Sequence, residues 1–303
     1  MADSKVEKAF PLQEVEFQLR DYVETLAGRI GPRSLYKPEK LEETAAFIQE
    51  LLEGWGFSVE SQEYRMWKTP VRNPVVHLSG APGKPYYLVG AHYDTVSHTP
   101  GADDNASAVA VALELARLVS QGTLGPSCPL TFVFFTLEEP PTFGTPLMGS
   151  RVYASRAKKA GHVIKGALIL EMVGYYCHEP GCQSYPPLVR QLLGLPRVGD
   201  FIGIIGDGKS RGLVEELEAA FKENPRLPVH SLVVPLRGYP LPGSRLSDNA
   251  SFWDKGYPAV MITDTAYYRN PNYHSIGDTP DTLDYAMMAQ LVKSLTLFLE
   301  GTK

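Results

Sequence analysis

The sequence has few cysteines, no long apolar run and no strongly basic segment, and each of these absences excludes a class of protein. Its 303 residues include only three cysteines, Cys128, Cys177 and Cys182, which is too few for a disulfide framework. No apolar run reaches the roughly 20 residues of a membrane-spanning helix, and the strongest one is interrupted by Glu114 and Arg117. No cluster of lysine and arginine has the density of a nucleic-acid contact surface. We therefore expect neither a membrane nor a nucleic acid as a partner.

The first residues also lack the pattern of a secretion signal. The segment MADSKVEKAF has no basic start followed by an apolar stretch, so we expect a cytoplasmic protein. A secreted protein expressed without its signal would look the same. In the cytoplasm the compartment rule favours free thiols. Cys177 and Cys182 are close enough in sequence to pair across a short loop, so this alternative stays open.

The composition is that of an ordinary globular protein. Hydrophobic residues make up 44% of the chain and charged residues 21%, with a formal net charge of -5. The chain is long enough to bury a large core. It contains no internal repeat, low-complexity tract or long linker, so we expect one catalytic domain over residues 1–303. The sequence predicts no particular oligomeric state.

Helical and strand patterns alternate along the chain, which is typical of a sheet covered by helices on both sides. We therefore predict an α/β fold with a three-layer α/β/α arrangement. The expected strands are short apolar or alternating segments at 57–66, 73–80, 85–92, 130–139, 166–171, 201–208, 229–236 and 258–265. The expected helices have apolar positions at helical spacing and cover 6–28, 38–54, 105–122, 148–160, 212–223 and 282–300.

Polar clusters follow four of the expected strands, at the sheet edge where open α/β proteins bind ligands. The first is AHYD, in which His92 and Asp94 are two residues apart and point to the same side of an extended strand. His92 can ligate a metal while Asp94 accepts a hydrogen bond from the other ring nitrogen. Taken alone, the pair is better explained as a surface histidine near an aspartate.

The next two clusters are pairs of adjacent carboxylates. Asp103 and Asp104 precede a helix, and capping explains one acidic residue there. Two adjacent carboxylates, the second of them twelve residues after His92, are better explained by a cation-binding site. Glu138 and Glu139 follow the most apolar strand and point in opposite directions, so one can bind metal while the other acts as general base. The alternative is a pair of exposed loop glutamates.

Glu171 and His274 complete the candidate set. Glu171 ends a buried strand and His274 lies in the loop YRNPNYHSIGDTPDT, with an ordinary loop position as the alternative for each. We interpret His77, His162 and His230 as surface residues. Two imidazoles and three or four carboxylates, without thiolates, suit zinc with open positions for water and substrate. In co-catalytic pairs two such ions lie roughly 3.5–4 Å apart and clamp a hydroxide and a carbonyl or phosphoryl oxygen.

Together these segments resemble the bacterial zinc aminopeptidase family, which includes secreted leucine aminopeptidases and, more distantly, glutaminyl cyclases. The resemblance spans about residues 88–285 and rests on GAHYDTV, PGADDNASA, LEE, LEMVGYY, SDNASFWDKGYPA and NPNYHSIGDTPDTLD. It implies a mixed, mostly parallel sheet of about eight strands between helix layers. It also implies two zinc ions per chain and hydrolysis of amide bonds, most simply removal of N-terminal residues from small peptides by an aminopeptidase or dipeptidase.

The resemblance further implies which residues bind the metals. Asp104 would bridge the two zinc ions, and a cis peptide bond is expected directly after it. His92 and Glu139 would bind one zinc. Glu171 and His274 would bind the other.

The remaining matched residues have catalytic or supporting roles in the family. Glu138 would be the general base that takes a proton from water and passes it to the leaving amine. Tyr273 would donate a hydrogen bond to the developing oxyanion. Asp94 would stand behind His92, and Asp103 would lie beside the bridging carboxylate without binding metal.

Two positions depart from the family's pattern. Relatives commonly have aspartate where Glu171 stands, and the extra methylene of glutamate would shift one metal. Many relatives have Ser-Asp-His where this chain has Ser247, Asp248 and Asn249. The second departure puts in doubt a pocket contact or a contact behind the ligands, and it does not affect the metals.

Three further interpretations concern the substrate. Five apolar side chains are expected to shape an apolar specificity pocket, with core packing as the alternative for each: Tyr175, Tyr176, Phe252, Met261 and Tyr267. Arg269 is interpreted as a surface arginine, with binding of a substrate carboxylate as the alternative. Segment 177–200 forms either a lid over the site or a passive loop, and the sequence does not decide between them.

Two other functions stay open. Glutaminyl cyclases work with one zinc and cyclise an acyl group, but they tend to carry tryptophan where this chain has Tyr273. N-acyl amino acids are an alternative substrate class for the same hydrolysis. A non-catalytic binding protein would have lost ligands or the base, whereas every matched position is filled here.

Overall fold

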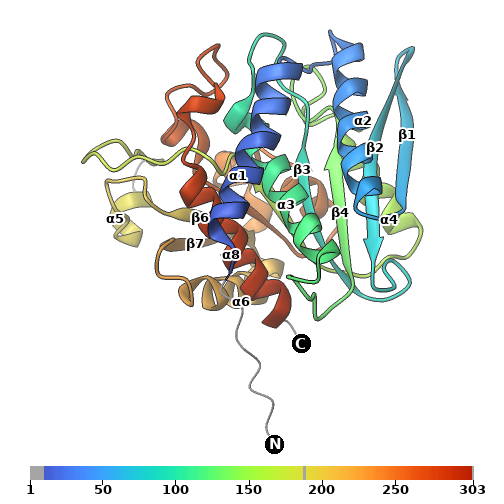
Figure 1. Cartoon of the computed structure of the whole chain (residues 1–303). Helices are drawn as coiled ribbons and strands as arrows, with labels where there is room; N and C mark the ends of the chain where they lie inside the picture. Colours follow the sequence, from blue (N-terminus) through green and yellow to red (C-terminus); the bar gives the residue numbers. More distant parts are fainter. Residues whose placement is uncertain (1–9, 187–188, 302–303) are drawn as a thin grey trace, which may run out of the picture.

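The computed structural model describes residues 10–186 and 189–301 and centres on one mixed eight-stranded sheet (Figure 1). The strand order is β1-β2-β4-β3-β5-β8-β6-β7, and four of the seven strand pairs are parallel. The strands are β1 (Val59–Met66), β2 (Thr69–Leu78), β3 (Tyr86–His92), β4 (Leu130–Phe135), β5 (Ile164–Glu171), β6 (Ile202–Asp207), β7 (Val229–Val234) and β8 (Ala259–Thr263). All eight expected strands are therefore confirmed.

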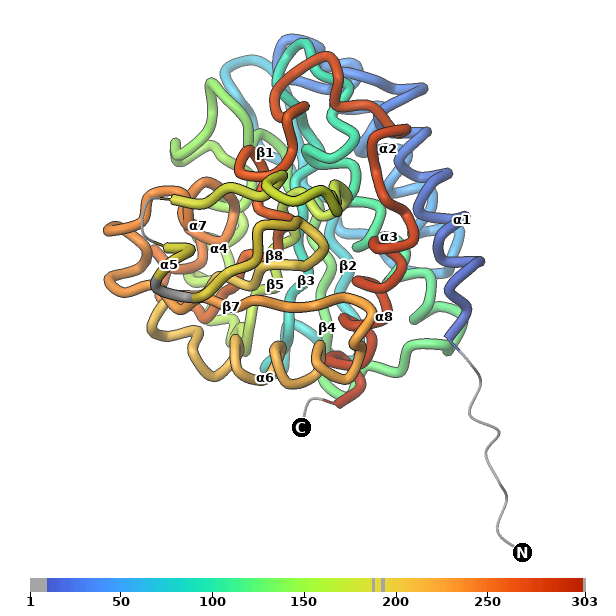
Figure 2. Tube along the Cα trace, turned by 90° about the vertical axis from the view of Figure 1, so that its left-hand side faces the viewer, coloured from blue at the N-terminus to red at the C-terminus, as the bar shows by residue number. Residues whose placement is uncertain are grey.

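Helices cover both faces of the sheet, which confirms the three-layer arrangement (Figure 2). One face packs against α1 (Leu12–Val23), α2 (Pro38–Gly54), α3 (Ala108–Ser120), α6 (Arg211–Lys222) and α8 (Tyr285–Gly301). The other packs against α4 (Gly149–Lys159) and α7 (Asn249–Asp254). Because successive side chains of a strand point to opposite faces, Leu88 joins the core under α4 and α7, while Val89 joins the core under the larger helix layer.

The sequence patterns missed two short helices, α7 and α5 (Val189–Leu193). Both are too short to show a helical repeat. The first helix begins at Leu12 and continues as a π-helical turn over Glu24–Ile30, and the expected residues 6–9 lie outside the described part of the chain. None of the helices in the described residues is long and apolar enough to cross a bilayer.

One expectation about cysteine was wrong. Cys177 and Cys182 form a disulfide across a short loop. The expectation that both are free thiols was therefore wrong, and the alternative of pairing is correct. Cys128 stays a thiol, and its sulfur accepts a hydrogen bond from Lys165 Nζ at 3.4 Å. Pairing across a loop of this length depends on how the chain folds back, which the spacing alone leaves open.

Arg33, which the sequence patterns did not single out, connects the first helices to the loop that follows β3. Its side chain is 0% exposed. The guanidinium donates to the carbonyl oxygens of Tyr93 at 2.7 Å, Pro100 at 2.6 Å and Gly101 at 2.7 Å. It also donates to the carbonyl oxygen of Leu26 at 3.3 Å. Burial lowers the pKa of Arg33 to about 10, so the group stays charged at neutral pH.

Replacement of Arg33 by methionine should lower the free energy of unfolding by about 3 kcal/mol, because several buried carbonyl groups lose their donor. Urea unfolding followed by circular dichroism measures the change. The matched control is Arg29→Met, whose side chain is 71% exposed and which should change stability by less than about 0.5 kcal/mol. Equal stabilities for the two variants would show that the Arg33 bonds contribute nothing net.

Candidate metal centre

The predicted site residues meet at the point where the chain changes direction across the sheet. Strand β3 lies between β4 and β5 and runs parallel to both, so the three carboxyl ends share one edge. His92 ends β3, Glu138 and Glu139 follow β4, and Glu171 ends β5. Ligands bind at this kind of switch point because the flanking connections leave in opposite directions and open a crevice.

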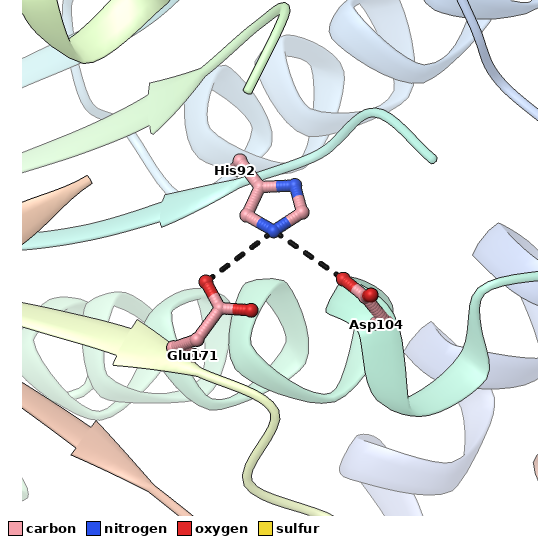
Figure 3. A group of neighbouring side chains, drawn as sticks. All are labelled: His92, Asp104 and Glu171. Atoms are coloured by element: carbon pink, nitrogen blue, oxygen red, sulfur yellow. Dashed lines mark ion pairs between the residues drawn. The ribbon is translucent and has the colours of Figure 1, made fainter. Parts of the chain in front are cut away.

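The first group of side chains has His92 at its centre (Figure 3). His92 Nε2 is 3.4 Å from Asp104 Oδ1 and 3.5 Å from Glu171 Oε2. Figure 3 shows the imidazole and the two carboxylates pointing toward one another from two strand ends and a helix start. All three residues are buried. The arrangement offers three ligand atoms to one cation.

The second group shares Asp104 with the first. His274 Nε2 is 3.1 Å from Asp104 Oδ2 and 3.4 Å from Glu139 Oε2. One oxygen of Asp104 therefore faces each histidine. The ligand atoms within each group lie within 4.8 Å of one another, which is close enough to hold a metal ion. Two groups joined by one carboxylate are the arrangement expected of a bridged pair of ions.

The pairing of ligands inferred from the resemblance was wrong in one respect. We expected His92 to share an ion with Glu139, and Glu171 to share one with His274. The structure instead places His92 with Glu171 and His274 with Glu139. The two glutamates come from strands on opposite sides of β3, and each lies close to a different histidine.

Three atoms of this cluster test whether a metal fits. His92 Nε2, Asp104 Oδ1 and Glu139 Oε1 are buried and make no hydrogen bond within the described residues. Buried polar atoms are otherwise almost always satisfied. Burial raises the pKa of Glu139 to about 7, and the charge of Asp104 adds to the effect. A bound cation would satisfy these atoms and balance the buried negative charge, so the residues fit a divalent metal with nitrogen and oxygen ligands.

Asp94 holds both the histidine and the glutamate pair in place. Its two carboxylate oxygens accept the backbone N–H groups of Glu138 and Glu139, each at 3.0 Å. His92 Nδ1 lies 3.1 Å from the carbonyl oxygen of Asp94 and 3.6 Å from its carboxylate. The expected contact with His92 is thus made by the carbonyl, because the carboxylate is engaged with the next strand.

A second buried carboxylate, Asp278, orients the bridging residue and was missed in the sequence. It accepts the backbone N–H of Asp103 at 2.8 Å and of Asp104 at 3.1 Å. Asp103 itself accepts bonds from the Gly174 backbone at 2.9 Å and from Asn270 Nδ2 at 2.7 Å, so it lies beside the ligands as expected. The only available signal was that Asp278 follows His274 by four residues.

The backbone around Asp104 also has special geometry. The peptide bond between Asp104 and Asn105 is cis, as expected. Gly101 has φ +66°, and a Cβ on it would lie 2.5 Å from the Asp104 carbonyl oxygen. Only glycine fits such a close approach. The loop therefore brings the bridging carboxylate to the strand ends by a path that larger residues would block.

Glu138 lies in neither metal group. Its side chain is 5% exposed, and burial raises its pKa well above the usual glutamate range. On the other side of the site, Ser247 Oγ donates to Glu171 Oε2 at 2.6 Å. Asp248 is fully buried, and burial raises its pKa to about 7. Neither Ser247 nor Asp248 was assigned a role from the sequence.

An apolar cavity of about 130 Å³ borders Glu171 and Tyr273. Met261 and Tyr267 line it, as expected. Placement of Phe252 in the pocket was wrong, because its ring is 0% exposed and packs against Phe135 in the core under α4 and α7.

The two other tyrosines assigned to the pocket do not line this cavity. Tyr176 is 8% exposed and packs in the core under the larger helix layer, so its assignment was also wrong. Tyr175 is half-buried, and its backbone N–H donates to Asp264 Oδ2 at 3.0 Å. Tyr176 therefore belongs to the core next to the site, and a buried carboxylate fixes the backbone of Tyr175.

The interpretation of Arg269 as a surface arginine was wrong. The side chain is 4% exposed, lies over the rings of Tyr176 and Phe201, and donates from Nε to Gln183 Oε1 at 2.7 Å. It therefore anchors the described part of segment 177–200, which contributes Tyr185, Pro186, Val189 and Leu195 to the cavity wall. His230 also lines the cavity and is not a plain surface residue.

Comparison with known proteins identifies related sequences. The model of the family described as Peptidase family M28 matches residues 73–298. The chain is 39% identical over 295 residues to a protein of Escherichia coli K12 named Uncharacterized protein YfbL, which covers 94% of this chain and 88% of that protein. It is 27% identical over 222 residues to a probable leucine aminopeptidase of Arthroderma benhamiae, covering 68% of this chain and 50% of the relative. The chain thus spans about half the length of the fungal protein.

Solved structures share the fold. The LapA aminopeptidase of Legionella pneumophila superposes with a TM-score of 0.72 at 19% identity, over 95% of this chain and 72% of that one. A glutaminyl cyclase of Fimbriiglobus ruber superposes with a TM-score of 0.69 at 22% identity, over 98% of this chain and 97% of that one. At such identities the likeness concerns the fold alone.

Metal binding should raise the melting temperature, because it relieves repulsion among the buried carboxylates. For protein stripped with EDTA, zinc at about 100 times its dissociation constant should add about 2.7 kcal/mol of stability. Thermal unfolding followed by circular dichroism measures this. The His274→Ala variant should respond less, whereas His98→Ala, which removes an exposed histidine, should respond like wild type. An unchanged melting temperature on adding zinc would contradict the assignment of this cluster.

Proposed function

The chain belongs to peptidase family M28, and from that premise we propose that it is a zinc exopeptidase that removes N-terminal residues from small peptides. One observation carries the proposal. Two histidine–carboxylate groups share Asp104, and the buried carboxyl group of Glu138 belongs to neither. The side chains that would bind metal are thus distinct from a carboxyl group that can transfer protons. Metal-assisted hydrolysis of an amide needs both metal ligands and such a proton-transferring group.

Each group would hold one zinc ion. His92, Asp104 and Glu171 form one set of ligands. Asp104, Glu139 and His274 form the other. When bound, the two ions would lower the pKa of a water at the site and polarise the substrate carbonyl. The set contains histidine and carboxylate ligands but no thiolate, which suits a catalytic zinc site with open positions.

Glu138 acts as the general base in this proposal. A base that works near neutral pH needs a carboxyl pKa above the usual glutamate range, and burial raises the pKa of Glu138 in that direction. Glu138 takes a proton from the attacking water and delivers it to the nitrogen of the leaving amine. The Asp94 carboxylate fixes the backbone of Glu138, so the base is held in position.

Two further contacts would position the substrate. Tyr273 borders the apolar cavity next to Glu171, and its ring stacks on His274 with centroids 3.8 Å apart. From this position it donates a hydrogen bond to the oxyanion that develops on the carbonyl oxygen. A free amino group of the substrate lies near Glu138 and Glu171, where negative charge favours an ammonium ion.

A matched substrate panel tests the proposal. Zinc-loaded protein is assayed with unblocked dipeptides and aminoacyl amides and with their N-acylated versions, and the products are identified by mass spectrometry. We expect cleavage of the unblocked set alone, because an acyl group removes the ammonium ion. Cleavage of the acylated set alone would replace the proposal by N-acyl amidohydrolysis. Cyclised products from N-terminal glutamine would replace it by the glutaminyl-cyclase reaction.

Replacement of Glu138 by glutamine should lower kcat by about 10² to 10⁴, because the base is lost while the shape of the side chain is kept. Steady-state kinetics on an unblocked dipeptide measures the loss, and elemental analysis should find the wild-type zinc content of two ions per chain. The matched variant Glu139→Gln should lose zinc as well as activity. A Glu138→Gln enzyme as active as wild type would exclude Glu138 as the base.

A further inference from the structure

A second cavity flanks the metal centre and has a different chemistry from the apolar one. Its volume is about 300 Å³. One wall follows the glutamate pair and includes Phe143, Gly144 and Met148, and the other includes Ser247. We call it the arginine cleft, because Arg151 of α4 and Arg245 contribute the charged side chains of its lining. Its other lining residues are Tyr239, Pro242, Leu246, Ala250 and Ser251.

Two lining residues of the arginine cleft contact residues of the metal centre. Ser247 Oγ donates to Glu171 Oε2 at 2.6 Å, so that wall touches a proposed ligand. Phe143, another lining residue, lies four positions after Glu139, and its backbone N–H donates to the Glu139 carbonyl oxygen at 3.3 Å. Leu246 lines both cavities and separates the cleft from the apolar one. Two compartments therefore adjoin the centre, one apolar and one cationic.

The charges of the cleft are not balanced. Arg151 Nη1 is 3.3 Å and Arg245 Nη2 is 2.9 Å from the two oxygens of Asp254, which is not part of the lining. Two guanidinium groups thus share one carboxylate that lies behind them. Arg151 Nε is buried and makes no hydrogen bond within the described residues. The cleft keeps about one positive charge, although the whole chain has a formal charge of -5.

Arg245 is also held in place before any ligand arrives. Arg245 Nη1 donates to the Arg237 carbonyl oxygen at 2.7 Å, and its guanidinium lies 4.3 Å from the centre of the Tyr239 ring. The side chain of Arg245 is 13% exposed. Guanidinium groups bind carboxylates through paired hydrogen bonds, and prior positioning reduces the entropy lost on binding.

We propose that the arginine cleft binds a carboxylate on the leaving part of the peptide. The inference rests on the proposed function and adds to it a substrate class, short or acidic peptides. The apolar cavity borders Glu171, the proposed partner of the free amino group, and suits the N-terminal side chain. The leaving part then lies toward the other compartment, the arginine cleft. The carboxylate is either the C-terminus of a short peptide or an acidic side chain.

Binding to the inactive Glu138→Gln protein tests the inference without turnover. Isothermal titration calorimetry is carried out on zinc-loaded protein with three peptides: leucyl-glycyl-glycine, its C-terminal amide, and leucyl-glycyl-glutamate with an amidated C-terminus. We expect the amide to bind about tenfold more weakly than a peptide with a carboxylate in reach. Whether the first or the third peptide binds best identifies the source of the carboxylate.

Two variants with opposite expected effects separate binding from a structural role. R151M/R245M/D254N removes both cations and their anion together, and it should abolish the preference for carboxylate over amide. D254N alone frees both arginines, and it should increase that preference. If Arg151 and Arg245 only brace the fold, both variants will weaken all three peptides alike. R156M, which removes another arginine of α4, should leave the preference unchanged.

The outcomes for the cleft and for the peptidase proposal are distinguishable. Equal binding of carboxylate and amide peptides overturns the cleft inference, even when the wild-type enzyme hydrolyses both. A carboxylate preference that is lost in R151M/R245M/D254N supports it, even when the wild-type enzyme hydrolyses neither peptide. In that case the hydrolytic proposal fails on the substrate panel and the cleft remains an anion-binding site for peptides.

Discussion

The structure is organised around the burial of negative charge at one edge of the sheet. Asp104 presents one oxygen to His92 and the other to His274. Glu139 and Glu171 approach from the ends of β4 and β5, the two strands that flank β3. Buried carboxylates are costly unless each is paired, hydrogen-bonded or bound to a metal. The loops around the centre supply partners for the supporting carboxylates. Among the described residues they leave His92 Nε2, Asp104 Oδ1 and Glu139 Oε1 without a hydrogen bond. A cation is the component that makes this arrangement favourable.

The supporting groups explain why the site is held so closely. Asp94 and Asp278 each accept two backbone N–H groups and thereby fix the residues that carry the ligands. Arg33 gathers the loop carbonyls beneath them with a fully buried guanidinium. These contacts use backbone groups that would otherwise be unsatisfied at the ends of strands and helices. The same contacts therefore stabilise the local fold and fix the geometry of the centre.

The surroundings of the centre divide the substrate into two parts. The apolar cavity lies beside Glu171 and Tyr273, and the arginine cleft begins where the glutamate pair ends. A peptide across the centre would place an apolar group in one compartment and a carboxylate in the other. In the proposed mechanism Glu138, which lies outside both ligand groups, would move the proton between water and leaving amine. This division is the basis for the proposal of an exopeptidase that acts on small substrates.

The sequence by itself determined the eight strands, the six long helices and the set of side chains that meet at the centre. These follow from local periodicity and from motifs that lie at strand ends. Only the tertiary structure decided that His92 pairs with Glu171, that Phe252 and Tyr176 belong to the core, and that Cys177 pairs with Cys182. It also showed that Arg33, Asp278 and Arg269 act as anchors. The physical reason is that these roles depend on contacts between segments far apart in sequence or on the path of a loop, which periodicity and spacing do not encode.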